Sequence, residues 1–358
     1  MGALTRTFSV PRPYLPLHGL EDGPERSRRE AKSGRTRLTS EGREGEGRKS
    51  NHNGGEDLTD KGREKQMQDK DEDDMLHITI HEPAFTGDNL GLKTWGAAYV
   101  LATLLSGPIL PLLLPLAHSI HQSAPADQPE SKVKIIELGA GTGLAGIAAA
   151  AMFPSRVQVT MTDLEPIVPN LRHNVGLNES VLSPNGNDVD VGEEVGVTVE
   201  VLDWTTVPNA PNPSASALAF ASDEDRGGVT EAAHKSPILD DGARRGGFDI
   251  ILAADSLYAT SHPGLVSNAI AFFLKRNEDA RVVSVMPDRG KGGGREFLDQ
   301  LREEMQVRGL GVVGEGWEVG GEDWDGHGCA DGGDESGEGE GEDRESGVRF
   351  WWAVWRWM

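Results

Sequence analysis

The sequence predicts an α/β fold, a Rossmann-like seven-stranded mixed sheet with helices on both faces. Three observations support this prediction. From Lys132 onward, short apolar runs alternate with helix-like stretches, and a glycine-rich turn follows the first run. The chain then closes on two strand-like segments separated by an acidic insert. Alternating strands and helices specify a parallel sheet covered on both faces, and a hairpin-like final pair adds an antiparallel edge.

The individual elements follow from these patterns. Strands are expected at 133–138, 157–162, 197–202, 248–253, 280–285, 310–319 and 348–358. Helices are expected at about 95–106, 144–152, 167–175 and 294–308. In the last helix the apolar residues recur at three-and-four spacing, which predicts one buried face. The final segment, VRFWWAVWRWM, is rich in aromatic and β-branched residues, which favour a packed strand over a ligand platform.

The domain organisation follows from composition. Residues 75–358 are expected to form one domain after a disordered N-terminal extension over residues 1–74. From about residue 20 that extension is charged and almost free of aliphatic residues, so it cannot bury enough apolar surface to offset chain entropy. Polar, glycine-rich and acidic stretches near 180–196, 208–247 and 320–346 are expected to be flexible inserts in the domain.

Charge and cysteine content exclude several function classes. The formal net charge of −23 disfavours direct binding to nucleic acid or an anionic membrane, which requires clustered Lys and Arg. The single cysteine, Cys329, excludes an intrachain disulfide and a multi-cysteine zinc site. No metal site is expected, because His77, His81 and Glu82 fit a strand face or an exposed loop better. The first residues lack the apolar core of a signal peptide, so we expect a cytoplasmic protein. We also expect it to be a monomer.

One apolar segment tests the expectation that no membrane is involved. Residues 97–117, AAYVLATLLSGPILPLLLPLA, are nearly charge-free and about long enough to span a bilayer. Pro108, Pro111 and Pro115 interrupt the segment. A buried helix, followed by a proline-punctuated turn into a short second helix, explains the pattern without a membrane.

The sharpest local signal is the glycine-rich run ELGAGTGL at 137–144, placed where a strand ends and a helix begins. Glycines permit a tight turn, and the helix N-terminus offers free N–H groups to an anion. The run also fits the G-x-G-x-x-G pattern of dinucleotide sites. Asp163, roughly twenty residues after the turn, could accept hydrogen bonds from ribose hydroxyls in either class of site, or cap the next helix.

Three further features distinguish between these classes. They are the run TGDNLGLKTWG at 86–96, the pair Asp203-Trp204, and the element Asp255-x-x-Tyr258. All lie near the carboxyl ends of predicted strands or just before the first one, where an open α/β sheet places its ligand crevice. A dinucleotide site leaves them unexplained. The loop at 288–294, DRGKGGG, does not match a phosphate-loop spacing and is expected to be a mobile loop at the substrate mouth.

Together these motifs resemble methyltransferase family 16, the seven-β-strand S-adenosylmethionine-dependent protein lysine methyltransferases. The resemblance covers about residues 76–358 with interruptions, and the DNLGLKTWG wording is most similar to fungal elongation-factor lysine methyltransferases. It implies S-adenosyl-L-methionine as cofactor and a translation elongation factor as protein substrate. The residues that it implies for the cofactor site are Trp95, Gly139, Ala140, Gly141, Asp163, Trp204 and Ala254.

Asp255 and Tyr258 are the candidate catalytic residues. A lysine must lose its proton before it attacks a methyl group, and its unperturbed pKa is about 10.4. Asp255 could orient the amine, while Tyr258 forms an aromatic wall or a hydrogen bond. The alternatives are a helix cap for Asp255 and plain packing for Tyr258, and the resemblance favours the functional roles. At the level of the whole protein, a small-molecule methyltransferase and a noncatalytic cofactor-binding scaffold stay open.

Overall fold

A seven-stranded mixed sheet is the centre of the protein. The computed structural model describes residues 2–13, 75–84, 90–113, 132–154, 156–183, 196–210, 246–289, 294–320 and 348–358. The strands lie in the order β5 (Val197–Val201), β4 (Val157–Asp163), β3 (Val133–Leu138), β6 (Ile250–Ala254), β7 (Arg281–Pro287), β9 (Arg349–Trp357), β8 (Leu310–Val319). The first five strands run parallel, whereas β9 is antiparallel to both β7 and β8. The predicted seven-stranded mixed sheet is therefore confirmed.

The burial of each strand follows from its place in the sheet. Every residue of the interior strand β7 before Pro287 is buried, as expected for a strand covered on both faces. The edge strand β8 instead alternates half-buried and exposed residues over most of its length. The strand order in the sheet places the carboxyl ends of β3, β4 and β6 side by side at one edge, and the predicted motifs meet there.

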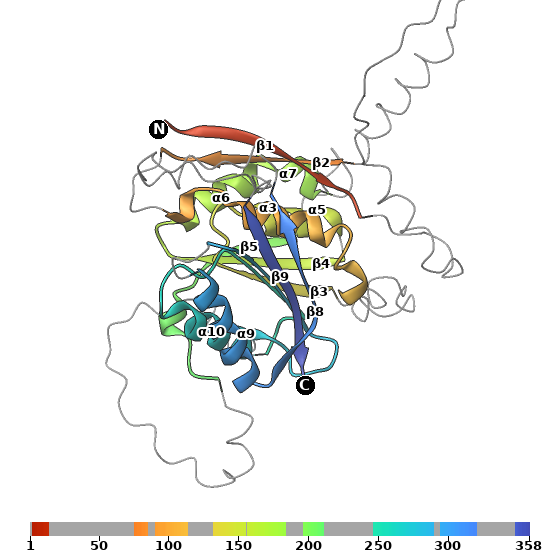
Figure 1. The fold of residues 1–358 in the computed structure, drawn as a ribbon. Helices are drawn as coiled ribbons and strands as arrows, with labels where there is room; N and C mark the ends of the chain where they lie inside the picture. Colours follow the sequence, from red (N-terminus) through yellow and green to blue (C-terminus); the bar gives the residue numbers. More distant parts are fainter. Residues whose placement is uncertain are drawn as a thin grey trace, which may run out of the picture. The chain divides into compact units, whose positions relative to one another are not determined.

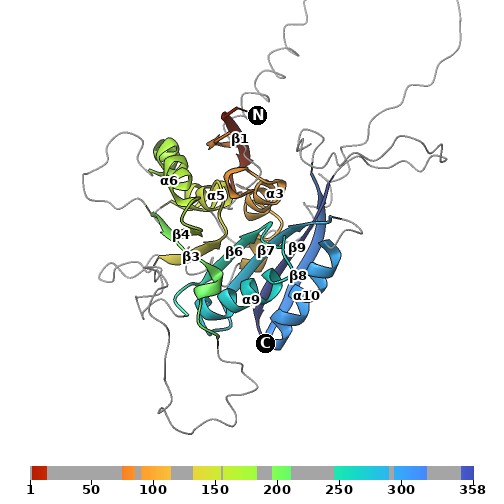
Figure 2. The same cartoon turned by 90° about the vertical axis from the view of Figure 1, so that its left-hand side faces the viewer.

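Helices cover both faces of the sheet. Helices α3 (Gly96–Leu105), α5 (Leu144–Met152), α6 (Val168–Leu177) and α7 (Glu179–Leu182) lie on one face, and α9 (His262–Phe273) and α10 (Gly294–Val307) lie on the other (Figures 1 and 2). Each face has its own apolar core. All nine residues of α5 are buried, because its small alanine side chains pack against the sheet on one side and a further strand pair on the other.

That strand pair corrects the prediction for the N-terminus. Strand β1 (Leu4–Pro11) pairs antiparallel with β2 (Met75–Glu82), and the pair lies over α3, α5 and α6 (Figure 1). Phe8 and Val10 of β1 join the same core as the β2 side chains. The expectation of disorder from residue 1 is therefore wrong for Leu4–Pro11, because the partner strand lies more than sixty residues away and gives no local signal. Residues 14–74 lie outside the described residues.

Other elements agree with their predicted bounds to within a few residues, with some omissions. Helices α7 and α9 and strand β2 were not predicted. The predicted insert near 180–196 includes the end of α7, and its residues 184–195, like 211–245 and 321–347, lie outside the described ranges. After α3, a 3-10 turn at Leu110–Leu113 follows the first proline. In the described part of the chain, no helix combines the length and apolarity needed to cross a membrane.

Candidate cofactor and acceptor site

The glycine turn between β3 and α5 has a backbone that only glycine adopts without strain. Gly139, Gly141 and Gly143 have φ values of +68°, +56° and +89°. A Cβ at Gly139 would lie 3.0 Å from Cζ2 of Trp204, so the turn faces the indole directly. Ala140, between the first two glycines, is buried and donates its N–H to the Thr162 carbonyl, 2.9 Å away. The structure thus brings the predicted turn and the predicted tryptophan together.

Asp163 ends β4 beside this turn and is bonded to it. Its Oδ2 accepts a 2.7 Å hydrogen bond from the Gly141 N–H, and its Oδ1 accepts another of 2.7 Å from Leu164. Burial raises the pKa of the Asp163 carboxyl, and the hydrogen bonds from Gly141 and Leu164 oppose that shift. Each carboxylate oxygen has two lone pairs, so acceptor capacity is left for ligand hydroxyls.

Glu137, the first residue of the glycine-rich run, lies beneath the turn and was assigned no role from sequence. Its side chain is fully buried, and its Oε2 accepts a 2.9 Å hydrogen bond from the Gly146 N–H of α5. Burial raises the pKa of Glu137 to about 8, the Gly146 hydrogen bond opposes this, and the charge of Asp163 raises it further. The carboxyl is therefore largely protonated at neutral pH.

The segment before α3 borders the turn from the N-terminal side. A Cβ built on Gly141 would lie 3.1 Å from the Gly91 carbonyl oxygen, so the two backbones are in close approach. Trp95 is half-buried at the start of α3, and its indole N–H donates to the Leu90 carbonyl at 2.9 Å. The Lys93 ammonium lies 5.1 Å from the Trp95 ring centroid. Trp95 is thus held in a short folded segment against the glycine turn.

A row of three aromatic rings extends from the turn. The His262 ring lies 5.6 Å from the Trp204 ring and 4.2 Å from the Tyr258 ring, edge-on to both. Nδ1 of His262 lies 3.0 Å from the Ser256 carbonyl oxygen, so this nitrogen carries the proton and donates. Burial lowers the pKa of His262 and so favours its neutral form. Sequence reasoning missed His262 because helix α9, which begins there, was not predicted.

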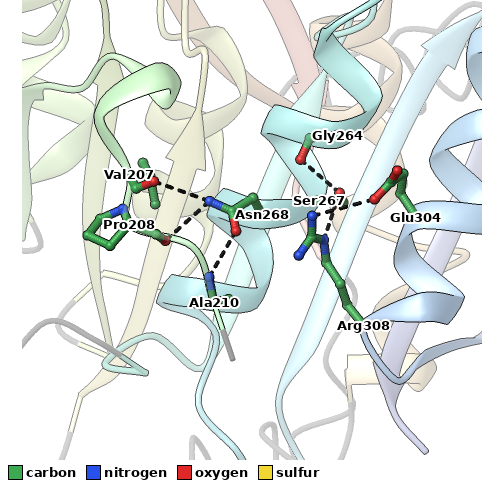
Figure 3. A network of polar contacts seen from close by, with 8 residues as sticks. All are labelled: Val207, Pro208, Ala210, Gly264, Ser267, Asn268, Glu304 and Arg308. Carbon is green, nitrogen blue, oxygen red and sulfur yellow. Dashed lines mark hydrogen bonds and ion pairs between the residues drawn. The ribbon is translucent and has the colours of Figure 1, made fainter. Parts of the chain in front are cut away.

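Helix α9 also positions the segment that carries Trp204. The buried Asn268 side chain donates to the Val207 and Pro208 carbonyls at 3.3 and 3.2 Å, and accepts from the Ala210 N–H at 2.9 Å (Figure 3). One turn before them, Trp204–Thr206 form a 3-10 helix capped by the Asp203 carboxylate. Asp203 therefore has a capping role, and the indole is presented by an anchored backbone.

Ser267, the residue before Asn268, connects α9 to the end of α10. The Ser267 hydroxyl donates to the Gly264 carbonyl at 3.0 Å and accepts from Arg308 Nε, also at 3.0 Å (Figure 3). Arg308 in turn contacts Glu304 at 3.4 Å. The helix that carries His262 and Asn268 is thus fixed on both sides.

Asp255, directly after β6 and Ala254, forms an ion pair that the sequence did not predict. Arg289 Nη2 donates to Asp255 Oδ1 at 2.6 Å, and the Asp255 side chain is only 8% exposed. Burial raises the pKa of Asp255, and the charge and hydrogen bond of Arg289 oppose that shift. Among the described non-glycine residues, Asp255 alone has a positive φ, +49°, which is a strained conformation typical of functional positions.

Tyr258 lies within electrostatic range of both carboxylates. Its pKa is raised by burial and further by the charges of Asp163 and Asp255, although 49% of its surface is exposed. The loop at 288–294 contributes through Arg289, which follows β7 as Asp255 follows the neighbouring β6. A cationic residue directly after a parallel strand, at the carboxyl edge of the sheet, is the sequence signal that could have identified Arg289. Residues 290–293, expected to form a mobile mouth, lie outside the described ranges.

The histidines near the N-terminus do not join this site. His77 pairs with Ser9 on the exposed face of the β1–β2 pair, and the His81 ring stacks edge-on to His173 at 5.3 Å. Across the ranges that the structure describes, no three His, Cys, Asp or Glu side chains cluster as metal ligands would.

The known proteins that this chain resembles in sequence include lysine methyltransferases. A family model described as lysine methyltransferase matches residues 72–224. The protein-lysine N-methyltransferase EFM2 of Saccharomyces cerevisiae is 31% identical over 253 residues, which are 69% of this chain and 48% of that protein. The protein-lysine N-methyltransferase rrg1 of Schizosaccharomyces pombe is 33% identical over 137 residues, 38% of this chain and 36% of that protein.

This chain spans about half the length, or less, of the curated relatives that it matches. Among solved structures, a TehB-like SAM-dependent methyltransferase from Corynebacterium glutamicum aligns with 74% of this chain and 89% of its own. The identity is 16% and the TM-score 0.33, a similarity too low to bear on function.

Proposed function

We propose that the chain is a protein-lysine N-methyltransferase that acts on a translation elongation factor in the cytoplasm. It belongs to the lysine methyltransferase family, whose cofactor is S-adenosyl-L-methionine. The observation that carries this proposal is the meeting, at one sheet edge, of a glycine-rich turn and a buried carboxylate that follows the adjacent strand β6. The first suits a nucleoside-linked amino acid, and the second suits an amine. The resemblance of the DNLGLKTWG run to fungal elongation-factor lysine methyltransferases supports an elongation factor as the substrate.

The residues at the ends of β3 and β4 fit the cofactor. The Trp204 indole packs so closely on Gly139 that a Cβ there would lie 3.0 Å from Cζ2, so glycine lets the indole and the backbone turn stand together as two sides of the proposed site. Gly139, Ala140 and Gly141 would receive the methionine moiety near the N-terminus of α5. The Asp163 carboxylate would accept from the ribose hydroxyls, and the Trp204 indole would pack against the adenine. Trp95 and Ala254 would complete the lining.

When bound, the cofactor supplies a methyl group activated by a positively charged sulfur, so the protein supplies alignment and controls protons. Proximity and orientation of the amine can contribute about 7 to 11 kcal/mol. Asp255 and Tyr258 would hold the acceptor amine. Arg289 bonds Oδ1 of Asp255, and no hydrogen bond to Oδ2 occurs among the described residues, so that oxygen can accept from the amine.

The charge balance of this site favours a neutral acceptor amine. Arg289 compensates the negative charge of Asp255, so the amine meets an ion pair and not a bare carboxylate. A nearby positive charge disfavours an ammonium and lowers its pKa, as does removal from water. The lysine can then lose its proton to solvent and attack as a free amine, with Oδ2 of Asp255 orienting its N–H.

Transfer of labelled methyl groups to a soluble cell extract, followed by mass spectrometry of the labelled protein, tests the proposal. We expect label on a lysine of a translation elongation factor. Asp255→Asn should lower the rate roughly ten- to a thousand-fold, which is within or below the range typical of a positioned acid-base group. The affinity for S-adenosylhomocysteine should change little. Label confined to small molecules would reassign the substrate class, and cofactor binding without any transfer would indicate a scaffold.

A further inference from the structure

Three asparagines on α6 and its C-cap face the edge of strand β2. Asn170, Asn174 and Asn178 are four residues apart and therefore lie on one side of the helix. Asn174 Oδ1 accepts from the His81 N–H at 2.8 Å, and Nδ2 of both Asn170 and Asn174 donates to the His81 carbonyl. Side-chain amides thus take the place of a neighbouring strand along the β2 edge.

Asn178 makes the same kind of contact one helical turn later. Its Oδ1 accepts from the Thr79 N–H at 2.8 Å, and its Nδ2 donates to the Thr79 carbonyl at 2.7 Å. Asn178 is 2% exposed and Asn174 is 0% exposed. The two side chains therefore bond the same strand from equally buried positions.

Asn174 differs from Asn178 in the second carbonyl to which its amide donates, because Asn178 Nδ2 donates to the Asn174 carbonyl at 2.7 Å. Asn174 Nδ2 instead donates to the carbonyl of Thr142, 2.9 Å away, inside the glycine turn. Thr142 is itself buried, and its hydroxyl lies 2.9 Å from that of Thr94, whose N–H donates to the Glu82 carboxylate at the end of β2. Strand β2 is therefore connected to the turn by two polar routes, one through Asn174 and one through Thr94.

A turn that contains three left-handed glycines needs such external restraint. Glycine loses more backbone freedom on ordering than any other residue. If the turn were loose in the free protein, ligand binding would have to order it, and affinity would fall by that cost. The Thr142 carbonyl lies between Gly141 and Gly143, so a hydrogen bond at this carbonyl restrains both.

We propose that Asn174 is a positioning residue for the cofactor, and that through it the β1–β2 pair is part of the cofactor-binding machinery. By holding the Thr142 carbonyl, Asn174 keeps the turn over Gly139–Gly143 in its binding geometry before the cofactor arrives. The inference rests on the proposed function, because it takes the glycine turn as the place where S-adenosyl-L-methionine binds.

Two matched variants of the full chain test this inference. Asn174→Ala and Asn178→Ala each remove a buried amide that bonds β2, so both should lower the melting temperature. Only Asn174→Ala also releases the Thr142 carbonyl. We expect the Kd for S-adenosylhomocysteine, measured by calorimetry, to rise roughly five- to twenty-fold in Asn174→Ala, the effect of one unsatisfied buried polar group, and less than about two-fold in Asn178→Ala.

A kinetic split separates positioning from general loosening. With soluble extract as acceptor, Asn174→Ala should raise the KM for S-adenosylmethionine while the rate at saturating cofactor stays within about two-fold of wild type. If Asn174→Ala does not fold, Asn174→Asp serves, because it keeps an acceptor for the His81 N–H but replaces the donor to Thr142. Equal affinity losses in the Asn174 and Asn178 variants, or none in either, would overturn the inference. Failure of the wild type to bind S-adenosylhomocysteine would instead refute the proposed function.

Discussion

Arg289 determines what the Asp255 carboxylate can do. The 2.6 Å contact neutralises a side chain that is almost fully buried, and a buried charge without a partner is costly. A bare carboxylate at this position would stabilise the ammonium form of an acceptor lysine, which is not nucleophilic. The ion pair therefore makes Asp255 a hydrogen-bond acceptor for the amine more than a trap for its charged form.

Arg289→Gln should move the acid limb of the kcat–pH profile to higher pH. Without the guanidinium, the lysine in the complex keeps its proton to a higher pH, so kcat near neutrality falls while the KM for the acceptor does not rise. Arg302→Gln is a suitable control, because Arg302 pairs with Glu315 on β8, which is the far edge strand of the sheet. A profile that stays in place in Arg289→Gln, or a raised KM with unchanged kcat, contradicts this role.

Glu137 should make the stability of the protein depend on pH. Its pKa is raised from 4.5 to about 8 in the folded state, so the folded protein binds the proton more tightly than the unfolded chain. The corresponding stabilisation is complete below pH 4.5 and is lost as pH rises to about 8. Glu137→Gln keeps an acceptor for the Gly146 N–H without a titrating group. Its melting temperature relative to wild type should therefore rise from pH 5 to pH 9, and a constant difference would contradict the shift.

At the scale of elements, β1 is part of the folded domain and not an appendage. Phe8 is buried in the core between the strand pair and the helices, whereas the adjacent Thr7 faces outward. The Tyr99 ring of α3 lies 6.2 Å from the Phe8 ring, and the Tyr99 hydroxyl donates to the Ser9 carbonyl. Strand β1 is thus attached both to β2 and to α3.

Phe8→Ala should reduce the free energy of unfolding by about 3 to 5 kcal/mol, the usual effect of removing a buried aromatic side chain. Thr7→Ala, one residue earlier on the exposed face, should change it by less than about 0.5 kcal/mol. Urea unfolding of the full chain measures both values. If the two variants are equally stable, the N-terminal strand does not pack as described.

At the scale of the whole molecule, the domain is completed by a hairpin whose two strands are far apart in sequence. Strands β8 and β9 pair along their length, up to Val319 opposite Arg349, and the Gly320 N–H donates to the Val348 carbonyl at 2.9 Å. The pairing therefore closes at Gly320 and Val348. We therefore expect a short connection between these two residues to keep the sheet intact.

Replacing residues 321–347 by a short Gly-Ser bridge should therefore leave the domain functional. Shortening a loop changes its closure entropy only slowly, by about 0.6 kcal/mol for each halving of length. We expect S-adenosylhomocysteine affinity within about two-fold of wild type, because the turn, Asp163 and Trp204 all lie at the other end of the strand order. A collapse of affinity in calorimetry would mean that the acidic segment supports the site.

The sequence by itself determined the elements and motifs whose signals are local. Apolar runs predicted the seven strands of the sheet, and the ELGAGTGL run predicted a turn that the structure places between β3 and α5. The neighbouring placement of Gly139, Asp163 and Trp204 also followed, because residues at the carboxyl ends of adjacent parallel strands must meet. Such patterns are readable because a strand or a turn depends on few consecutive residues.

Only the tertiary structure decided which distant groups are partners. Arg289 bonds Asp255 across 34 residues, Asn174 bonds Thr142 across 32, and Phe8 of β1 pairs with Ile78 of β2 across the long segment between them. From the sequence alone, polar side chains at such positions are equally compatible with solvent exposure, helix capping or ion pairing. Their roles emerge only when folding removes them from water, because each buried donor and carboxylate must then find a partner within reach.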